Sequence, residues 1–180
     1  MDILTKYLSI DGLIEDPSQL LIIQELSILQ SHLNTLDKRE NNFLNMSFSN
    51  KEEWNNKGMY LWGDVGRGKT LLMDLFFETL DVKNKKRLHF HHLLDGIHEE
   101  LKLRKNAENP IKGIVKSIAK DVKVICFDEF YIEDIADAMI LSRLLDNIFK
   151  HNIYLVITSN TEPSELYKGG LQRELFLPAI

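Results

Sequence analysis

Residues 63–70 read Gly-Asp-Val-Gly-Arg-Gly-Lys-Thr, which is the pattern G-x-x-x-x-G-K-[ST] of a phosphate-binding loop. The glycines leave the backbone free to fold around an anion with its N–H groups pointing inward. In such a loop Lys69 reaches the β- and γ-phosphates of a nucleotide, and the Thr70 hydroxyl is a ligand of Mg²⁺. The predicted nucleotide-binding residues are Gly63, Asp64, Val65, Gly66, Arg67, Gly68, Lys69, Thr70 and Leu71.

The residues on either side of the loop fit this interpretation. Residues 59–62 form a short apolar run that predicts a buried strand, and residues 71–77 have the apolar face of a helix. The N-terminus of that helix would face the phosphates. Strand, loop and helix in this order favour a phosphate site over the alternative, a glycine-rich turn with a solvated lysine.

Two acidic residues follow a second apolar run. Residues 122–127 are rich in β-branched side chains and predict a buried parallel strand, and Asp128 and Glu129 come directly after it. Ligands of such sheets bind beyond the carboxyl ends of the strands. We expect Asp128 to hold Mg²⁺ opposite Thr70, and Glu129 to orient and polarise the attacking water. The alternative is a pair of ordinary acids at a strand end.

Asn160 and Arg173 are further candidates for catalysis. Asn160 follows the predicted strand at residues 153–157, where its amide could contact the attacking water or the γ-phosphate; a turn-forming asparagine is the alternative. Arg173 could supply charge to the active site of a neighbouring subunit. Its alternative is a surface ion pair with Glu165 or Glu174.

Histidine and cysteine residues give weaker signals. Alternation would place His89 and His91 on one face of a strand at residues 87–91, but no carboxylate or thiolate partner is evident. For His89, His91, His92 and His98 we therefore expect packed or hydrogen-bonded side chains and no metal site. Cys126 lies within an apolar strand and is expected to be a small buried hydrophobe.

Composition indicates an ordinary soluble domain. The chain has 180 residues, 44% of them hydrophobic, and a net charge of −5, which gives no general attraction to nucleic acid or anionic membrane. Its single cysteine excludes an intrachain disulfide and fits a reducing compartment. No secretory signal and no apolar run of membrane-spanning length is visible, so a cytoplasmic protein is expected.

The elements that must position these residues alternate between strands and helices. A helix is expected to start at Asp16, with Pro17 at its first position and Gln19 closing a capping box. Further helices are expected at residues 92–103 and 111–119, after Asp134, which would act as a cap, and in a short stretch opening at Pro163. This order predicts a three-layer α/β/α fold with a parallel sheet.

Two regions are expected in the chain. Residues 1–57 would be an N-terminal helical extension and connector, and residues 58–180 the nucleotide-binding core. The connector from Asp37 to Lys57 is polar and asparagine-rich but carries scattered apolar side chains, which indicate an ordered segment. These side chains are Phe43, Leu44, Phe48 and Trp54.

Taken together, these motifs resemble one family closely, the ZapE-type ATPases, which are AFG-like members of the AAA+ superfamily. The resemblance covers nearly the whole chain. It is carried by residues 16–19, 60–70, 89–91 with His98, 126–130, 134–141, 158–160, 166–168, 170–173 and 176–180. The phosphate loop is widespread among proteins, whereas the stretches at 134–141 and 170–173 are far more specific.

The resemblance implies ATP hydrolysis by a homo-oligomeric assembly with an AAA+ core. Lys69 and Thr70 match its Walker A motif. Asp128 and Glu129 match Walker B, Asn160 matches sensor 1, and Arg173 matches an arginine finger. Bacterial members act at the division septum on the tubulin-like protein FtsZ, and mitochondrial members act in protein quality control.

This sequence departs from the family pattern in three ways. His92 stands where arginine is common, and Leu94 where methionine is frequent. Members of the family also continue past residues 178–180 into another strand and a helical lid carrying sensor 2. The core is therefore expected to lack the lid, with weak hydrolysis.

The function predicted from these observations is an ATPase that remodels a protein partner, with a role in cell division. One alternative keeps the fold and acts on single-stranded DNA, as a helicase loader does, but the overall acidity and the absence of a basic–aromatic cluster make nucleic acid an unlikely partner. A second alternative is a nucleotide-dependent switch that hardly hydrolyses. A GTPase is disfavoured because no Asn-Lys-x-Asp motif is present.

Overall fold

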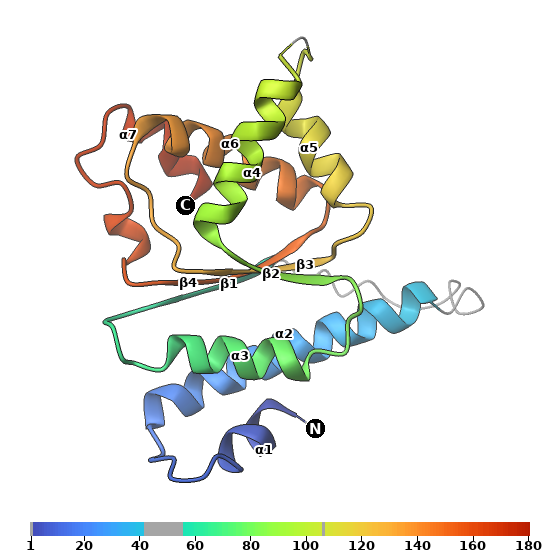
Figure 1. The fold of residues 1–180 in the computed structure, drawn as a ribbon. Helices are drawn as coiled ribbons and strands as arrows, with labels where there is room; N and C mark the ends of the chain where they lie inside the picture. The colour runs from blue at the N-terminus through green and yellow to red at the C-terminus, as the bar shows by residue number, and fades with distance from the viewer. Residues whose placement is uncertain (1, 42–55, 106) are drawn as a thin grey trace.

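The computed structural model describes residues 2–41, 56–105 and 107–180. Within these residues, four parallel strands form one sheet in the order β1-β4-β3-β2 (Figure 1). The strands are β1 (Gly58–Trp62), β2 (Lys85–His89), β3 (Val124–Asp128) and β4 (Tyr154–Ser159). All five residues of β3 are buried, as expected for a strand covered on both faces.

Helices cover both faces of the sheet (Figure 1). On one face lie α1 (Ile3–Leu8), α2 (Pro17–Asn41) and α3 (Lys69–Thr79). On the other lie α4 (Phe90–Leu103), α5 (Pro110–Ile118), α6 (Ile135–Lys150) and α7 (Arg173–Phe176), with single 3₁₀ turns at Pro163–Glu165 and Leu177–Ala179. The predicted three-layer α/β/α fold is confirmed.

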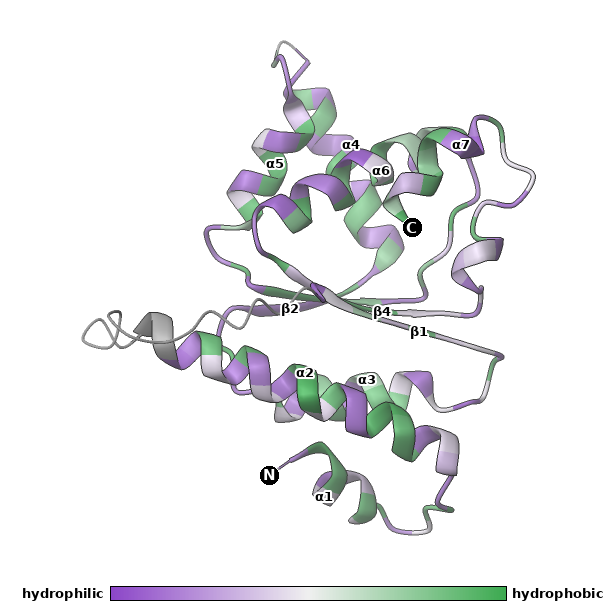
Figure 2. Ribbon diagram, turned by 180° about the vertical axis from the view of Figure 1, so that it is seen from behind, coloured by the Kyte–Doolittle hydropathy of each residue, from purple (hydrophilic) through white to green (hydrophobic). Residues whose placement is uncertain are grey.

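The sheet divides the hydrophobic core in two, because successive side chains of a strand point to opposite faces. Val124 and Cys126 of β3 pack with α1, α2 and α3. Ile125 and Phe127 pack with the helices of the opposite layer. Hydrophobic and hydrophilic residues follow one another along these helices, as expected where one side faces the core and the other faces solvent (Figure 2).

Cys126 is buried in this core, as predicted. Burial raises the pKa of its thiol to about 12. Among the described residues, no helix is both long and apolar enough to cross a membrane.

The N-terminal helices differ in part from expectation. Asp16 caps α2, accepting a hydrogen bond from the Ser18 backbone N–H at 2.8 Å. Gln19 does not close a capping box, because its side chain is hydrogen-bonded to Arg67 and Tyr7 instead. Helix α2 continues to Asn41, beyond the expected start of the connector. The predicted anchors of that connector, Phe43, Leu44, Phe48 and Trp54, lie outside the described residues.

The prediction that His89 and His91 share a strand face is wrong. β2 ends at His89, and Phe90 is the first residue of α4. Phe90 is fully buried, and it continues along the helix into Leu94 and Ile97 at helical spacing. Burial of this apolar face favours an earlier helix start than the alternating pattern suggested.

Candidate functional site

The phosphate loop connects β1 to α3, and its glycines have the backbone angles that the turn requires. Gly66 and Gly68 have φ values of 81° and 80°, a conformation that residues with a Cβ rarely adopt. Gly68 lies directly before Lys69, which opens α3. The loop therefore ends at a helix N-terminus, whose unpaired N–H groups favour an anion.

Three strand ends meet at a cavity of about 350 Å³ beside this loop. It is lined by Val65, Gly66, Gly68, Lys69, Thr70, Glu129, Thr158, Ser159 and Asn160. The structure thus brings the loop, Glu129 and Asn160 together, as the parallel topology predicts. The other residues predicted for the site do not line the cavity: Gly63, Asp64, Arg67, Leu71, Asp128 and Arg173.

The Lys69 side chain folds back over its own loop. Its Nζ donates to the Gly63 carbonyl at 2.8 Å and to the Asp64 carbonyl at 2.9 Å. An ammonium group has three N–H donors, so these contacts leave one to spare. The arrangement holds the positive charge at the cavity wall, where a phosphate oxygen would compete with the two carbonyls.

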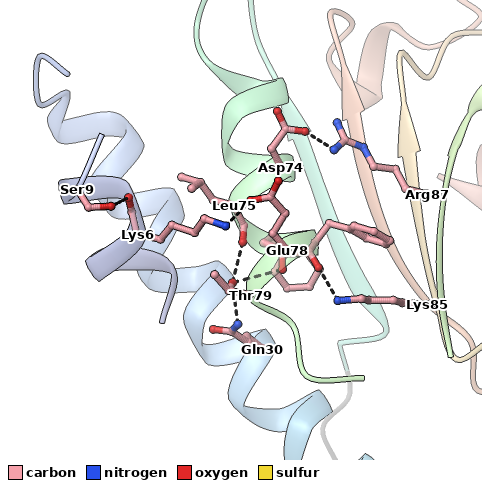
Figure 3. A network of polar contacts seen from close by, with 11 residues as sticks. Lys6, Ser9, Gln30, Asp74, Leu75, Glu78, Thr79, Lys85 and Arg87 are labelled. Atoms are coloured by element: carbon pink, nitrogen blue, oxygen red, sulfur yellow. Dashed lines mark hydrogen bonds and ion pairs between the residues drawn. The ribbon is translucent and has the colours of Figure 1, made fainter. Parts of the chain in front are cut away.

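Asp128, at the end of β3, is buried and paired with Arg87. The Arg87 Nε donates to Oδ2 at 2.6 Å and Nη2 donates to Oδ1 at 3.3 Å, and the Thr158 hydroxyl lies 3.5 Å from Oδ1. Arg87 also forms an ion pair with Asp74 of α3 (Figure 3). A single guanidinium therefore joins β2, the end of β3 and the helix that follows the phosphate loop.

Arg87 is a residue that the sequence analysis did not identify. Burial alone would lower its pKa, but hydrogen bonds to Asp128 and Asp74, together with their charges, raise that pKa above its ordinary value. In the sheet register Arg87 lies opposite Cys126, two residues before Asp128, so the two side chains share one face. A charged residue within a predicted strand was the available signal, and the pairing of that strand with β3 was needed to give Arg87 a partner.

Glu129 occupies a strained turn directly after β3. Its φ of 57° is in the left-handed region, which costs about 1–2 kcal/mol for a residue with a Cβ. The turn is held to β4, because the Glu129 N–H donates to the Thr158 hydroxyl at 3.3 Å and the Phe130 N–H to the Thr158 carbonyl at 2.8 Å. Strain of this kind often marks functional sites, and here it accompanies a carboxylate at the cavity.

Asn160 is exposed and lines the cavity, while its neighbour makes the turn contacts. The Ser159 hydroxyl donates to the Phe130 carbonyl at 2.6 Å and accepts from the Thr161 N–H at 3.0 Å. Within the described residues the Asn160 side chain makes no hydrogen bond. This arrangement favours the interpretation that the Asn160 amide faces a ligand over the alternative that Asn160 stabilises the turn.

Arg173 lies away from the cavity, at the start of α7. Its Nε donates to the Leu166 carbonyl at 3.0 Å and its Nη2 to the Ser164 carbonyl at 2.6 Å. The ion pair with Glu165 or Glu174 considered above is not formed; Glu165 instead pairs with Lys168 at 2.7 Å.

The histidines make ordinary local contacts. The His91 ring is hydrogen-bonded to the Tyr131 hydroxyl, and His98 Nε2 lies 2.9 Å from the Asp137 carboxylate. In the part of the chain that the structure describes, no group of three or more His, Cys, Asp or Glu side chains is placed to hold a metal ion. The expectation of hydrogen-bonded histidines is confirmed for these two.

A parallel sheet with a phosphate loop between β1 and α3, and acidic and amide side chains at the neighbouring strand ends, defines the core of a P-loop NTPase of the AAA+ type. The chain belongs to one family within this class. The model of the AFG1-like ATPase family matches residues 3–180.

Two relatives illustrate this membership. The chain is 49% identical to the cell division protein ZapE of Escherichia coli over 124 residues, which are 69% of this chain and 33% of that protein. It is 37% identical over 198 aligned residues to lactation elevated protein 1 homolog B of Danio rerio, covering 99% of this chain and 39% of that protein. The chain thus spans between a third and two fifths of the length of these relatives.

Solved structures share the fold. AMPPCP-bound DnaA from Aquifex aeolicus superimposes with a TM-score of 0.59 at 17% identity, covering 93% of this chain and 47% of that one. The DnaC helicase loader superimposes with a TM-score of 0.58 at 14% identity, covering 94% of this chain and 87% of that one. At these identities the likeness is one of fold alone.

Proposed function

We propose that the protein is an ATPase that couples ATP hydrolysis to the remodelling of a protein partner. The observation that carries the proposal is the single cavity on which Lys69, Glu129 and Asn160 meet. A phosphate-binding lysine, a carboxylate and an amide on one cavity are the groups that phosphoryl transfer to water needs. Membership of the AFG1-like ATPase family supports the same reaction.

The chain's own groups divide the work of binding. The N–H groups of the loop and the Lys69 ammonium bind the phosphates, with Lys69 exchanging its contacts to the Gly63 and Asp64 carbonyls for phosphate oxygens. The Thr70 hydroxyl and the Asp128 carboxylate are hard oxygen donors that suit Mg²⁺. When bound, Mg²⁺ would neutralise charge on the β- and γ-phosphates, and Asp128 would be shared between the cation and Arg87.

The catalytic groups act on the attacking water and on the transferred charge. Glu129 orients and polarises the water, and the Asn160 amide fixes its position against the γ-phosphate. Arg173 acts in trans, entering the active site of a neighbouring subunit in a homo-oligomer. Its position supports this assignment, because Arg173 does not line the cavity of its own chain and its guanidinium donates to the Leu166 and Ser164 carbonyls.

The partner and the process are proposed from the relatives. ZapE of Escherichia coli is named as a cell division protein, and we propose a division role for this chain, with FtsZ as the remodelled protein. The site of action would be the cytoplasmic face of the division septum. A pull-down from cells with a Glu129→Gln variant of the complete protein, which would retain ATP and partner together, tests the identity of the partner.

The enzymatic proposal is tested by titrating a fluorescent ATP analogue into two variants. Lys69→Ala removes a charge that contacts phosphate, so nucleotide affinity should fall by about 100-fold or more. Glu129→Gln keeps Lys69, Thr70 and Asp128, so affinity should stay near that of the wild type while hydrolysis is lost. Equal affinity in the two variants would contradict the assigned roles. Nucleotide binding without turnover in the wild type would favour the nucleotide-dependent switch.

A further inference from the structure

One side-chain amide connects the N-terminal segment to the phosphate loop. Gln19, in the first turn of α2, donates from Nε2 to the Arg67 carbonyl at 3.1 Å. Its Oε1 accepts a hydrogen bond from the Tyr7 hydroxyl at 3.0 Å. Tyr7 belongs to α1 and is fully buried, so its hydroxyl is held in place by the core around its ring. Both ends of the Gln19 amide are therefore used, and they join α1, α2 and the loop.

The contact to Arg67 determines the direction of an N–H group in the loop. In a planar trans peptide, the carbonyl and the following N–H point to opposite sides. The Arg67 carbonyl points to Gln19, outside the cavity, so the Gly68 N–H of the same peptide points away from Gln19. Gly68 lines the cavity and Arg67 does not. Gln19 thus fixes the orientation of the Arg67–Gly68 peptide, whose N–H lies on the side of the loop that would bind the nucleotide.

Gly68 leaves room for this contact. A Cβ built on Gly68 would lie 2.5 Å from the Gln19 Nε2, far inside van der Waals contact. The same residue has a φ of 80°, so glycine satisfies the backbone angle and the approach of Gln19 together. The phosphate loop and the start of α2 are built to fit one another.

The segment that carries Tyr7 and Gln19 is also attached to α3 at other points (Figure 3). Lys6 of α1 forms an ion pair with Glu78. Gln30 of α2 donates to the Thr79 hydroxyl at 2.8 Å. The N-terminal segment therefore contacts both the phosphate loop and the C-terminal end of α3, the helix that follows this loop.

We propose that Tyr7 and Gln19 are positioning residues that couple the docking of residues 2–41 to the shape of the phosphate loop. Nucleotide binding and the packing of this segment then stabilise each other, since coupling between two sites is reciprocal. The inference rests on the proposed function, because it requires that the loop bind a nucleotide. Loss of the Gln19 amide should weaken nucleotide binding on the order of tenfold, which corresponds to the net free energy of about one hydrogen bond.

The test compares Gln19→Ala with Gln24→Ala, a matched change at an exposed position of the same helix. Affinity for the fluorescent ATP analogue is measured with the melting temperature of the nucleotide-free protein. Gln19→Ala should lose affinity about tenfold, and Gln24→Ala should match the wild type. Tyr7→Phe, which removes only the hydroxyl, should shift affinity in the same direction by less, and the double variant should lose little beyond Gln19→Ala.

Amide hydrogen exchange distinguishes coupling from a purely structural role of Gln19, because a purely structural role would not make the exchange of residues 3–20 depend on nucleotide. In the wild type, adding nucleotide should slow amide exchange in residues 3–20, and this protection should be lost in Gln19→Ala. If the wild type binds nucleotide but residues 3–20 gain no protection, or if Gln19→Ala and Tyr7→Phe both bind like the wild type, the coupling is refuted while the proposed function stands. If the wild type itself fails to bind, the proposed function has failed. Should Gln19→Ala not fold, Tyr7→Phe decides the question by the same two measurements.

Discussion

The residues around the cavity and the segment around Arg173 show two ways in which a site is assembled. Thr70, Glu129 and Asn160 come from distant parts of the sequence and line one cavity. Arg173 follows Asn160 closely in the chain but is bonded to carbonyls of its own segment. Parallel strands share an edge at which their carboxyl ends meet, and this brings the first group together. Arg173 lies further along the chain than the end of β4, where the sheet edge no longer fixes the position of a side chain. On our proposal its target therefore lies on another subunit.

The largest effect that we expect is a loss of hydrolysis when the Arg173 side chain is removed. Arg173→Ala in a complete protein should lower hydrolysis by about 10³-fold, since an arginine finger stabilises charge in the transition state, and should leave nucleotide affinity nearly unchanged. Steady-state turnover and titration of the ATP analogue measure the two quantities. A parallel loss of affinity would mean that Arg173 serves its own chain's cavity.

Mixing two inactive variants makes the same comparison sharper. An Arg173→Ala subunit keeps Glu129, and a Glu129→Gln subunit keeps Arg173, so a mixed oligomer would contain some complete interfaces. Partial recovery of turnover is expected. If mixed oligomers form and no turnover returns, the trans assignment is wrong.

The second effect concerns the part of the site that is fixed within one chain. Arg87→Met would leave the buried Asp128 carboxylate without its cation, and should lower the free energy of unfolding by about 3 kcal/mol. Urea unfolding measures this loss. Mg²⁺ alone should restore part of it, because the cation would replace Arg87 as a partner of Asp128. Asp74→Asn is the control: it removes the more exposed partner of Arg87 and should cost less than about 1 kcal/mol.

Asn160→Ala should have a smaller effect, confined to turnover. Loss of an amide that positions the attacking water should slow hydrolysis about tenfold and change nucleotide affinity little. Ser159→Ala is the comparison, because it removes both turn hydrogen bonds of the Ser159 hydroxyl and should cost about 1–3 kcal/mol in stability. The turn-residue interpretation would win if Asn160→Ala lowered the melting temperature and left turnover per folded molecule intact.

The smallest effect that we expect is a difference in stability between two substitutions of Glu129, caused by its backbone conformation. Glu129→Gly and Glu129→Ala both remove the carboxylate and should both abolish hydrolysis. Glycine tolerates the φ of 57°, so Glu129→Gly should be more stable than Glu129→Ala by about 1 kcal/mol. Thermal melts of the two variants check this. Equal stabilities would show that the turn relaxes when the side chain is removed.

Local sequence pattern predicted much of the fold and the cavity. Apolar runs predicted β1, β3 and β4, and Asp134 caps α6 by accepting from the Asp137 N–H at 2.9 Å. The parallel topology then placed Glu129 and Asn160 with the phosphate loop. These features depend on the spacing of residue types along the chain, which can be read directly from the sequence.

Features that depend on contacts between distant segments were not predicted. Arg87 finds Asp128 through the pairing of β2 with β3, and Gln19 finds Arg67 through the packing of α2 on α3. Helix α1 was missed because only Ile3 and Tyr7 anchor its six residues, too few to form a recognisable pattern. The left-handed turn at Glu129 follows from its attachment to β4 and has no signature in the residue type.

The burial of Cys126 provides a built-in probe of how the sheet opens. Burial raises the pKa of this thiol to about 12, so the reactive thiolate is scarce near neutral pH, and the surrounding core excludes reagents as well. A disulfide reagent would therefore modify the chain only during moments when β3 separates from its neighbours. Because this is the sole cysteine of the sequence, labelling kinetics would report the opening of the central strand without any engineered tag.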